Sequence, residues 1–379
     1  MGGFRLHYFL LVLNSVHHGH SLLAVPRSRG TASARSSSRD YDGIRPPSLA
    51  APSSGSSVVS RRRRRRRRRS SSSLAAHRDD GENFKDGSIR VARSDGSSHR
   101  LSYRVARPAS LSSRLAAPIV VLHGGPSVPS NYLYPLADAV PYRSIVFHDQ
   151  LGCGASDEPT DASLYSIEDS VKDLKGLLKH LGVRRFHLYG QSYGGILAFE
   201  YLKSVAMDGR GGGDKSDDGA PVCLSAILSS SPTNVKVVES EAALLIQELA
   251  SSSSSPSNDA TEEVAVEELF RRTHQCRLPE MPSAIRDAYA NAGSVWRGTS
   301  AISDYVAEPP AEGASRMPST MIMRGEYDFV SEAAVSGWRD AFNTKSLRYK
   351  TLMGCSHHGL SEDGTLYGEI VNSFFGEYD

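Results

Sequence analysis

The chain is poor in cysteine, has no long apolar run and, in its first 80 residues, has neither lysine nor glutamate. Its four cysteines stand far apart, without Cys-x-x-Cys spacing, at positions Cys153, Cys223, Cys276 and Cys355. That scatter indicates neither a zinc site nor a disulfide framework, so we expect no metal and no cofactor. The apolar run at residues 8–13 is too short to cross a bilayer, which needs roughly 20 apolar residues, so no membrane span is expected.

Charge is unevenly distributed along the chain. The first 80 residues hold 16 arginines, nine of them consecutive from Arg61 to Arg69, against four aspartates. The whole chain has 44 basic and 42 acidic residues, so residues 81–379 retain 28 and 38 and carry a formal charge of −10. An acidic body does not favour nucleic-acid binding, and we expect no nucleic-acid partner for it.

Residues 1–80 admit three interpretations. Arg5 followed by the apolar run at 8–13 resembles a short signal segment, and the Arg- and Ser-rich tract after it resembles an organelle transit peptide. A disordered tail whose arginines form a solvated, self-repelling block is the second interpretation. A basic nucleic-acid arm is the third, although no aromatic residues are interleaved with the arginines. We favour targeting to an organelle or the secretory pathway over a cytoplasmic protein with a disordered leader.

The most informative motif is Gly190-Gln191-Ser192-Tyr193-Gly194. It follows an apolar run at 186–189 and leads into residues 195–202, which have helical character. A strand, a sharp turn and a helix in this order predict a nucleophile elbow, with Ser192 exposed at the turn. The glycines are needed because a side chain at either position would clash with the crossing backbone.

A second strand end supports this interpretation. Residues 118–122 form an apolar run typical of a buried parallel strand and lead into His123-Gly124-Gly125-Pro126. Glycines there allow backbone N–H groups to approach the charge that develops on a carbonyl oxygen during acyl transfer. We predict that Gly125 and Tyr193 donate to that oxyanion. The alternative is a plain tight turn, which Gly and Pro also favour.

Two further strand ends carry titratable residues. Apolar runs at 319–323 and 347–353 precede Asp328 and His357. Parallel strands present their carboxyl ends at one edge of a sheet, where open sheets hold their chemistry. The chain order Ser192, Asp328, His357 is that of an α/β-hydrolase triad. In such a triad His357 is the general base and Asp328 orients it and stabilises its charged form.

Together these motifs resemble the prolyl iminopeptidase (proline-specific aminopeptidase) branch of the α/β-hydrolases, over roughly residues 87–379. The resemblance implies an α/β fold with a mostly parallel, doubly wound sheet and a helical cap. It also implies a serine peptidase that releases N-terminal proline or another small residue from peptides. The motifs that carry it are His123-Gly124-Gly125-Pro126, residues 149–156, Gly190 to Gly195, Gly325 to Asp328, and Cys355-Ser356-His357.

The chain departs from the family in its substrate-binding residues. Family members hold the amino terminus of the substrate with two acidic side chains, one in the cap and one directly after the catalytic Asp. The corresponding residues here are Asp304 and Phe329, so one carboxylate is missing. Losing a charge-assisted partner costs on the order of 1.5–3 kcal/mol. Ser127 also stands where the family has glycine, next to the oxyanion loop.

These departures keep other functions open. One alternative is an amidase or esterase of the same fold that acts on small neutral acyl substrates, with the Phe329 ring lining an apolar pocket. The other is a non-catalytic binding protein of the same fold, which the complete triad disfavours. The expected partner is a small peptide, amide or ester substrate.

The resemblance also suggests a domain plan. Residues 81–235 and 315–379 would form the two parts of the core, and residues 236–314 the helical cap. Helices are predicted at 237–249 and 262–274 within the cap, with aromatic candidates for the pocket wall at Tyr289, Trp296 and Tyr305. In the core we predict a hairpin turning at Asp95-Gly96, a helix at 167–178, a strand at 224–228 and a flexible loop at 209–219.

Overall fold

The computed structural model describes residues 84–108, 116–207, 220–252, 260–311, 317–342 and 347–379, with only the backbone described for 260–264. The predicted leader at 1–80 and the predicted flexible loop at 209–219 lie outside these residues. Residues 80–379 belong to one compact unit. The strands are β1 (Phe84–Ala92), β2 (Ser98–Ala106), β3 (Ile119–Leu122), β4 (Ile145–His148), β5 (Arg185–Gln191), β6 (Val222–Ser229), β7 (Ser319–Gly325) and β8 (Leu347–Leu352).

These strands form one sheet in the order β1-β2-β4-β3-β5-β6-β7-β8. From β4 to β8 every neighbouring pair is parallel, while β2 is antiparallel to both β1 and β4. The β1–β2 hairpin turns at Asp95-Gly96 as predicted, with Gly96 at a φ of 84°. The sheet therefore has the predicted mostly parallel α/β architecture, with chain crossovers that place β5 at its centre.

Both faces of the sheet are covered, which explains the apolar runs in the sequence. Along β3, Val120 and Leu122 contribute to one core cluster, and Ile119 and Val121 to the other. This alternation follows from the two-residue period of a strand. A strand buried on both faces reads as a continuous apolar run rather than an alternating one.

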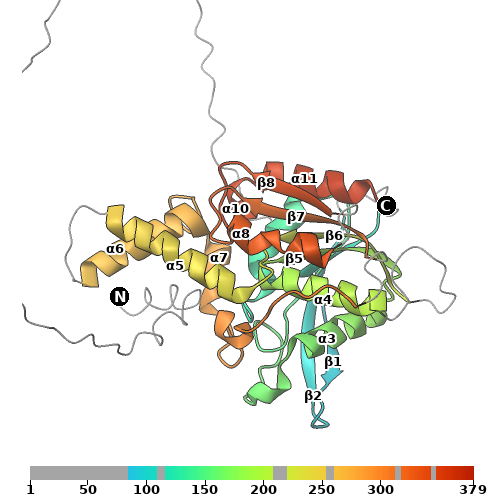
Figure 1. Ribbon diagram of the computed structural model, residues 1–379. Coiled ribbons are helices and arrows are strands. Elements are labelled where there is room, and N and C mark those ends of the chain that lie inside the picture. The colour runs from blue at the N-terminus through green and yellow to red at the C-terminus, as the bar shows by residue number, and fades with distance from the viewer. Residues whose placement is uncertain (1–83, 109–115, 208–219, 253–259, 312–316, 343–346) are drawn as a thin grey trace, which may run out of the picture. The chain divides into compact units, whose positions relative to one another are not determined.

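Helices of the core lie on both sides of the sheet (Figure 1). The first cluster includes residues of α3 (Ile167–His180) and α4 (Tyr193–Met207), and the second includes residues of α2 (Pro135–Ala139) and α11 (Gly364–Gly376). The helix predicted at 167–178 is α3, which Ser166 caps by accepting a hydrogen bond from the Asp169 backbone N–H. The remaining core elements are η3 (Ser130–Leu133), η4 (Ala162–Leu164), α8 (Glu332–Ser336), α9 (Trp338–Ala341) and α10 (Gly359–Glu362).

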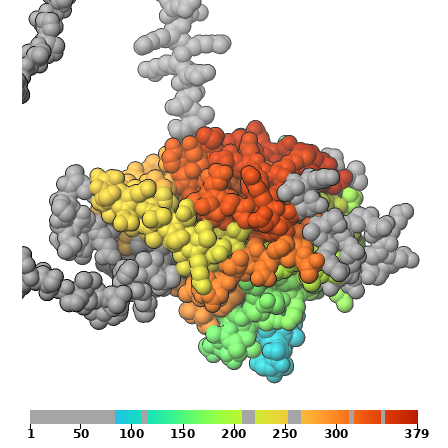
Figure 2. All heavy atoms as spheres, viewed as in Figure 1, coloured from blue at the N-terminus to red at the C-terminus, as the bar shows by residue number. Residues whose placement is uncertain are grey.

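The stretch between β6 and β7 is helical, as predicted. We call residues 235–302 the cap segment; it contains α5 (Val235–Ser252), α6 (Ala260–Phe270), η5 (Arg271–Gln275), α7 (Ser283–Ala290) and η6 (Thr299–Ile302). The yellow surface of α5 lies against the orange surface of α8 in Figure 2, and the two helices are in contact. The division of the chain into core and cap at 235 and 314 stays a prediction, because the two parts belong to the same compact unit.

Within the described ranges, no helix is both long and apolar enough to span a membrane.

Candidate active site

Ser192 lies on a sharp turn between β5 and α4. Its φ of 54° is in the left-handed region, which a non-glycine residue adopts at a cost of roughly 1–3 kcal/mol. A Cβ at Gly190 would lie 2.2 Å from the Gly194 carbonyl oxygen, and one at Gly194 would lie 2.0 Å from the Leu122 carbonyl oxygen. The glycines flanking Ser192 are therefore steric requirements of this turn, as the motif predicted.

The loop after β3 lies beside Ser192. Gly125 has a φ of 120°, and among the described residues its backbone N–H has no hydrogen-bond partner. Tyr193 is the first residue of α4, so its N–H is one of those that a helix leaves without an internal partner. Gly125, Ser192 and Tyr193 all line the same cavity, at the positively polarised N-terminus of α4. Gly125 and Tyr193, whose backbone N–H groups have no hydrogen-bond partner among the described residues, thus line the cavity together with Ser192.

Ser127, which departs from the family pattern, connects this loop to the cap segment. It too is left-handed, with a φ of 66°, and it is buried. Its hydroxyl donates to the Trp296 carbonyl oxygen at 2.5 Å, and its own carbonyl accepts from the Gly293 N–H at 2.9 Å. These bonds hold a serine in a conformation that favours glycine. They also join the loop after β3 to the chain that follows α7.

His357 and Asp328 form a buried pair at the ends of β8 and β7. The His357 Nδ1–H donates to Asp328 Oδ1 at 2.9 Å, and the same oxygen accepts from the Val330 N–H at 2.9 Å. Both side chains are almost fully buried, and among the residues that the structure describes Asp328 Oδ2 has no hydrogen-bond partner. A buried carboxylate with one uncompensated oxygen is costly to desolvate and is stabilised by a positive charge on its neighbour. The pair is thus set to stabilise a protonated His357.

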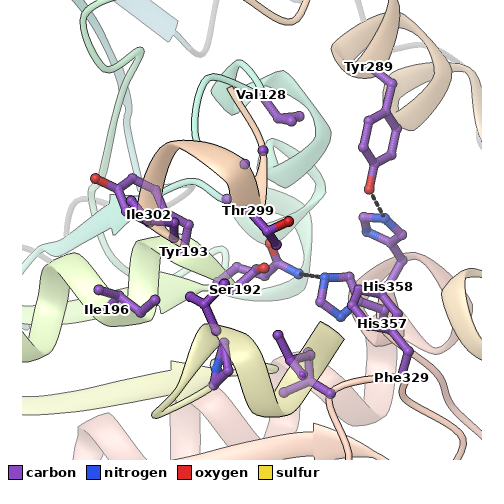
Figure 3. Close-up of a pocket in the computed structure, with 18 of the residues that line it drawn as sticks. Val128, Ser192, Tyr193, Ile196, Tyr289, Thr299, Ile302, Phe329, His357 and His358 are labelled. Atoms are coloured by element: carbon purple, nitrogen blue, oxygen red, sulfur yellow. Dashed lines mark hydrogen bonds between the residues drawn. The ribbon is translucent and has the colours of Figure 1, made fainter. Parts of the chain in front are cut away.

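Gln191 occupies the other nitrogen of His357, a contact that the sequence did not predict. Its side-chain amide lies 3.1 Å from His357 Nε2, drawn as a dashed line in Figure 3. Its Oε1 accepts a 2.6 Å hydrogen bond from the Tyr132 hydroxyl, which in turn accepts from the Gly124 N–H at 2.8 Å. Among the described residues, no hydrogen bond joins Ser192 to His357. The only feature of the sequence that could have indicated this contact is the polar side chain of Gln191 directly before Ser192.

The direction of these hydrogen bonds fixes the form of His357. Tyr132 uses its only hydrogen toward Gln191, so the Gln191 amide oxygen accepts and its NH₂ group donates to His357 Nε2. His357 Nε2 must therefore carry a lone pair, and Nδ1 carries the hydrogen toward Asp328. This is the neutral tautomer that a general base requires.

The adjacent histidine has a different role. His358 Nε2 lies 3.2 Å from the Tyr289 hydroxyl (Figure 3). The same hydroxyl accepts a hydrogen bond from the Gln275 amide at 3.2 Å. Burial, with a further contribution from His357, lowers the pKa of His358 well below its usual value. His358 is therefore a neutral residue that contacts the cap segment, and it is not in contact with Asp328.

The π-helical turn η5 of the cap segment contacts the two loops that carry Asp328 and His357. Its backbone carbonyls at His274 and Gln275 accept from the His357 and His358 N–H groups at 3.3 and 3.1 Å. The His274 ring donates from Nδ1 to the Tyr327 carbonyl oxygen at 2.8 Å. Single π-helical turns are rare and are often found at functional sites. Here the turn fixes the backbone on which His357 is mounted, together with the residue before Asp328.

A small cavity opens in front of Ser192 and is bounded by core and cap residues. Its volume is about 70 Å³; one water needs roughly 10–15 Å³ on this measure, so the space suits a small group. The Phe329 ring lies 4.2 Å from the His357 ring, centroid to centroid, and closes one side. The described residues that line it are Gly124, Gly125, Val128, Tyr132, Gln191, Ser192, Tyr193, Ile196, Pro232, Val235, Val238, Tyr289, Gly298, Thr299, Ile302, Phe329, Val330, His357 and His358.

Asp304, the expected anchor for a substrate amino group, is not among these residues. Its side chain is 88% exposed and forms a 2.7 Å ion pair with Lys236. A carboxylate in that position is solvated and already paired, so the structure does not support the predicted binding role of Asp304. Phe329 does line the cavity, as expected for the residue that replaces the second carboxylate.

Of the three aromatic candidates for the pocket wall, only Tyr289 lines the cavity. Trp296 packs edge-on against Tyr193 and stacks on Tyr165. Tyr305 donates to Glu200 at 3.0 Å. Trp296 therefore joins the end of the cap segment to the core, and Tyr305, just after the cap segment, joins the chain to α4. Neither residue lines the cavity.

The glycine-rich loop at 149–156 is hydrogen-bonded to the chain segment that follows β3. Asp149 Oδ1 accepts from the Ser130 N–H and hydroxyl at 2.9 and 2.8 Å, and Oδ2 accepts from the Ala155 N–H at 2.9 Å. Both carboxylate oxygens are thus used to join two loops. In the part of the chain that the structure describes, no three His, Cys, Asp or Glu residues are grouped so as to hold a metal ion.

Comparison with known protein families matches residues 119–366 to the alpha/beta hydrolase family. The proline iminopeptidase of Saccharolobus solfataricus is 30% identical over 277 residues, which is 68% of this chain and 84% of that protein. The proline iminopeptidase of Lactobacillus delbrueckii subsp. bulgaricus is 25% identical over 280 residues, which is 68% of this chain and 89% of that protein.

Among solved structures, the proline iminopeptidase of Mycobacterium smegmatis has a similar fold. The TM-score is 0.60 at 20% sequence identity, covering 77% of this chain and 98% of that one. At this identity the similarity concerns the fold.

Proposed function

The chain belongs to the alpha/beta hydrolase family, in its proline iminopeptidase branch, and from this premise we propose that it is a serine hydrolase with the triad Ser192, Asp328 and His357. The observation that carries the proposal is the 2.9 Å hydrogen bond between His357 and Asp328, directed so that His357 Nε2 keeps its lone pair. Ser192 and His357 line the same cavity (Figure 3).

Acylation begins when His357 Nε2 takes the proton of the Ser192 hydroxyl. The Gln191 amide must first yield its hydrogen bond to this nitrogen. Ser192 Oγ then attacks the substrate carbonyl, and the N–H groups of Gly125 and Tyr193 stabilise the oxyanion, a contribution of about 3–4 kcal/mol for one donor in related chemistry. Asp328 stabilises the imidazolium that forms.

The same groups complete acylation and then carry out deacylation. His357 gives its proton to the leaving amine or alcohol as the tetrahedral intermediate collapses to an acyl-enzyme. A water molecule then attacks, with His357 again taking a proton and returning it to Ser192. The cavity of about 70 Å³ beside Ser192 holds the acyl group.

The names of the relatives make an N-terminal prolyl residue the first acyl group to consider. We propose that the enzyme releases N-terminal proline or another small residue from peptides. The small, mostly apolar cavity supports a compact ring or a short aliphatic chain, since a group of that size fills it without a charged contact.

Two measurements test the proposal. A fluorophosphonate, which reacts with activated serines, should label the full chain once, and peptide mapping should locate the label on Ser192. A panel of prolyl, alanyl and leucyl naphthylamides beside short-chain nitrophenyl esters should show turnover that the same reagent abolishes. Absence of both labelling and turnover would favour a non-catalytic binding protein of this fold.

A further inference from the structure

The cavity beside Ser192 contains no charged side chain among the described residues that line it. Eight have aliphatic or aromatic hydrocarbon side chains, and the polar ones carry hydroxyl, amide and imidazole groups. Binding of a free amino terminus in its usual ammonium form requires a carboxylate or several free acceptors, because burying an unpaired charge costs several kcal/mol. The lining supplies no such carboxylate.

The strongest acceptors in the cavity are already engaged. The Gln191 amide oxygen and the Tyr132 hydroxyl accept hydrogen bonds from Tyr132 and Gly124, respectively. The Tyr289 hydroxyl contacts both His358 and the Gln275 amide. An ammonium group would therefore have to share these oxygens with the bonds that position His357 and His358.

Carboxylates outside the cavity are committed elsewhere. Asp304 pairs with Lys236 in solvent, and Glu200 pairs with Lys203 at 2.7 Å while accepting from Tyr305. Asp328 is held between His357 and the Val330 N–H behind the catalytic ring. None of the three lines the cavity.

The local field also opposes a cation. The N-terminus of the 15-residue α4 points its unpaired N–H groups at the cavity and carries partial positive charge. His357 gains a full positive charge during acylation, in the same wall. An ammonium held on the acyl group would lie close to both, which raises the barrier as well as weakening binding.

We infer that Ser192 accepts acyl groups only in uncharged form. A prolyl substrate reacts through its neutral free base, and a carbocyclic acyl group of the same shape is the better substrate. This inference rests on the proposed serine-hydrolase function. Selectivity for the acyl group then comes from the apolar wall formed by Ile302, Phe329 and Val330, together with the uncharged residues of η6 that line the cavity. It does not come from an ion pair with the amino terminus of the substrate.

The decisive pair of substrates is proline 2-naphthylamide and cyclopentanecarboxylic acid 2-naphthylamide, which differ by one ring NH in place of CH₂. A free amine with a pKa near 8 is only about one-tenth uncharged at pH 7. We expect kcat/KM for the cyclopentyl substrate to be at least tenfold higher at pH 7. The ratio of the two values should narrow as the pH rises to 9, and titration of the enzyme cancels in that ratio.

A matched pair of variants tests the missing charge directly. Thr299 lines the cavity on η6, so Thr299→Glu introduces a carboxylate and Thr299→Gln the same shape without the charge. The Glu variant should shift the preference toward the prolyl substrate by at least fivefold at pH 7, and the Gln variant should leave the ratio where it was.

The outcomes separate the two proposals. Preference of the native protein for prolyl over cyclopentyl naphthylamide at pH 7, with a ratio that does not change up to pH 9, would overturn the uncharged-acyl inference while leaving Ser192 as nucleophile. Failure of fluorophosphonate to label Ser192, together with no turnover of either substrate, would overturn the serine-hydrolase function and the inference with it.

Discussion

The side-chain amide of Gln191 lies 3.1 Å from His357 Nε2, the nitrogen that the proposed mechanism uses to take the proton of Ser192. In the resting protein this amide holds the imidazole in its neutral form with the lone pair facing the cavity. The same contact has to open before Ser192 can bond to His357. Gln191 thus positions the base and at the same time competes with the nucleophile for it.

Replacing Gln191 with Glu should move the pH dependence of the reaction. A carboxylate at this distance favours the protonated imidazole, and an opposite charge within about 4–6 Å moves such an equilibrium by roughly 1–3 pH units. Because only the neutral imidazole takes a proton, the acid limb of kcat/KM should shift to higher pH and activity at pH 7 should fall. The measurement is a pH profile from 5 to 10.

Gln191→Met serves as the control, because it removes the amide and adds no charge. Its acid limb should stay at the native pH even if its turnover number differs. A Glu variant with the native pH profile would show that Gln191 does not act on His357.

Ser192→Ala should lose several orders of magnitude in kcat with an unchanged fold. A triad without its nucleophile retains only the catalysis that binding and the oxyanion donors provide. Ester hydrolysis, fluorophosphonate labelling and the melting temperature should be compared with the native chain at equal purity. Retention of more than a few per cent of kcat would exclude Ser192 as nucleophile.

The neighbouring histidines should respond differently to the same substitution. His357→Gln removes the base that contacts Asp328 and should be inactive, since His357 is the only described histidine that hydrogen-bonds to that carboxylate. His358→Gln keeps a polar side chain beside Tyr289 and should retain measurable turnover, with a higher KM if the cavity wall shifts. The reverse pattern would reassign the base.

Acid should weaken the fold through buried histidines. Burial lowers the pKa of His187 to about 4 and that of His148 to about 3, from an ordinary value near 6.5. Below pH 6.5 the unfolded chain binds protons that the folded chain excludes, so the free energy of unfolding falls by about 1.4 kcal/mol per pH unit for each histidine until its folded pKa is reached. Urea unfolding at pH 7, 6 and 5 measures this slope.

His187→Asn isolates one contribution to that slope. His187 donates from Nε2 to Asp379 at 3.1 Å and shares a 2.8 Å hydrogen bond with the Ser225 hydroxyl through Nδ1. The variant should be less stable at pH 7 but lose stability more slowly toward pH 5. Equal slopes for the variant and the native chain would mean that the pKa of His187 is not lowered by folding.

The elbow, the sheet and the pairing of Asp328 with His357 were predictable because short-range steric rules determine them. A Cβ at Gly190 or Gly194 would lie less than 2.5 Å from backbone atoms, so glycine is required at both positions. The apolar runs indicate strands that are buried on both faces. The helices that connect the parallel strands then bring the carboxyl ends of these strands together at one edge of the sheet. None of these inferences needs a side-chain rotamer.

The substrate side of the site was less predictable because it depends on how the cap segment turns. Asp304 stands two residues after η6, and the direction of that turn points it to Lys236 in solvent rather than to the cavity. The contact of Gln191 with His357 depends on a side-chain torsion and on Tyr132 from another loop. Neither the direction of this turn nor the contact of Gln191 with His357 produces a periodic pattern in the sequence.

The π-helical turn η5 has a consequence for how such a protein diversifies. Its backbone accepts the hydrogen bond from the His357 N–H, while other parts of the cap segment line the cavity beside Ser192. An insertion or deletion between β6 and β7 therefore changes the selectivity for substrate and the alignment of the base in one event. Lineages that vary this segment should gain new substrates mainly by exchanging single side chains on α5 and η6, where the wall can change without moving the residues that hold the imidazole.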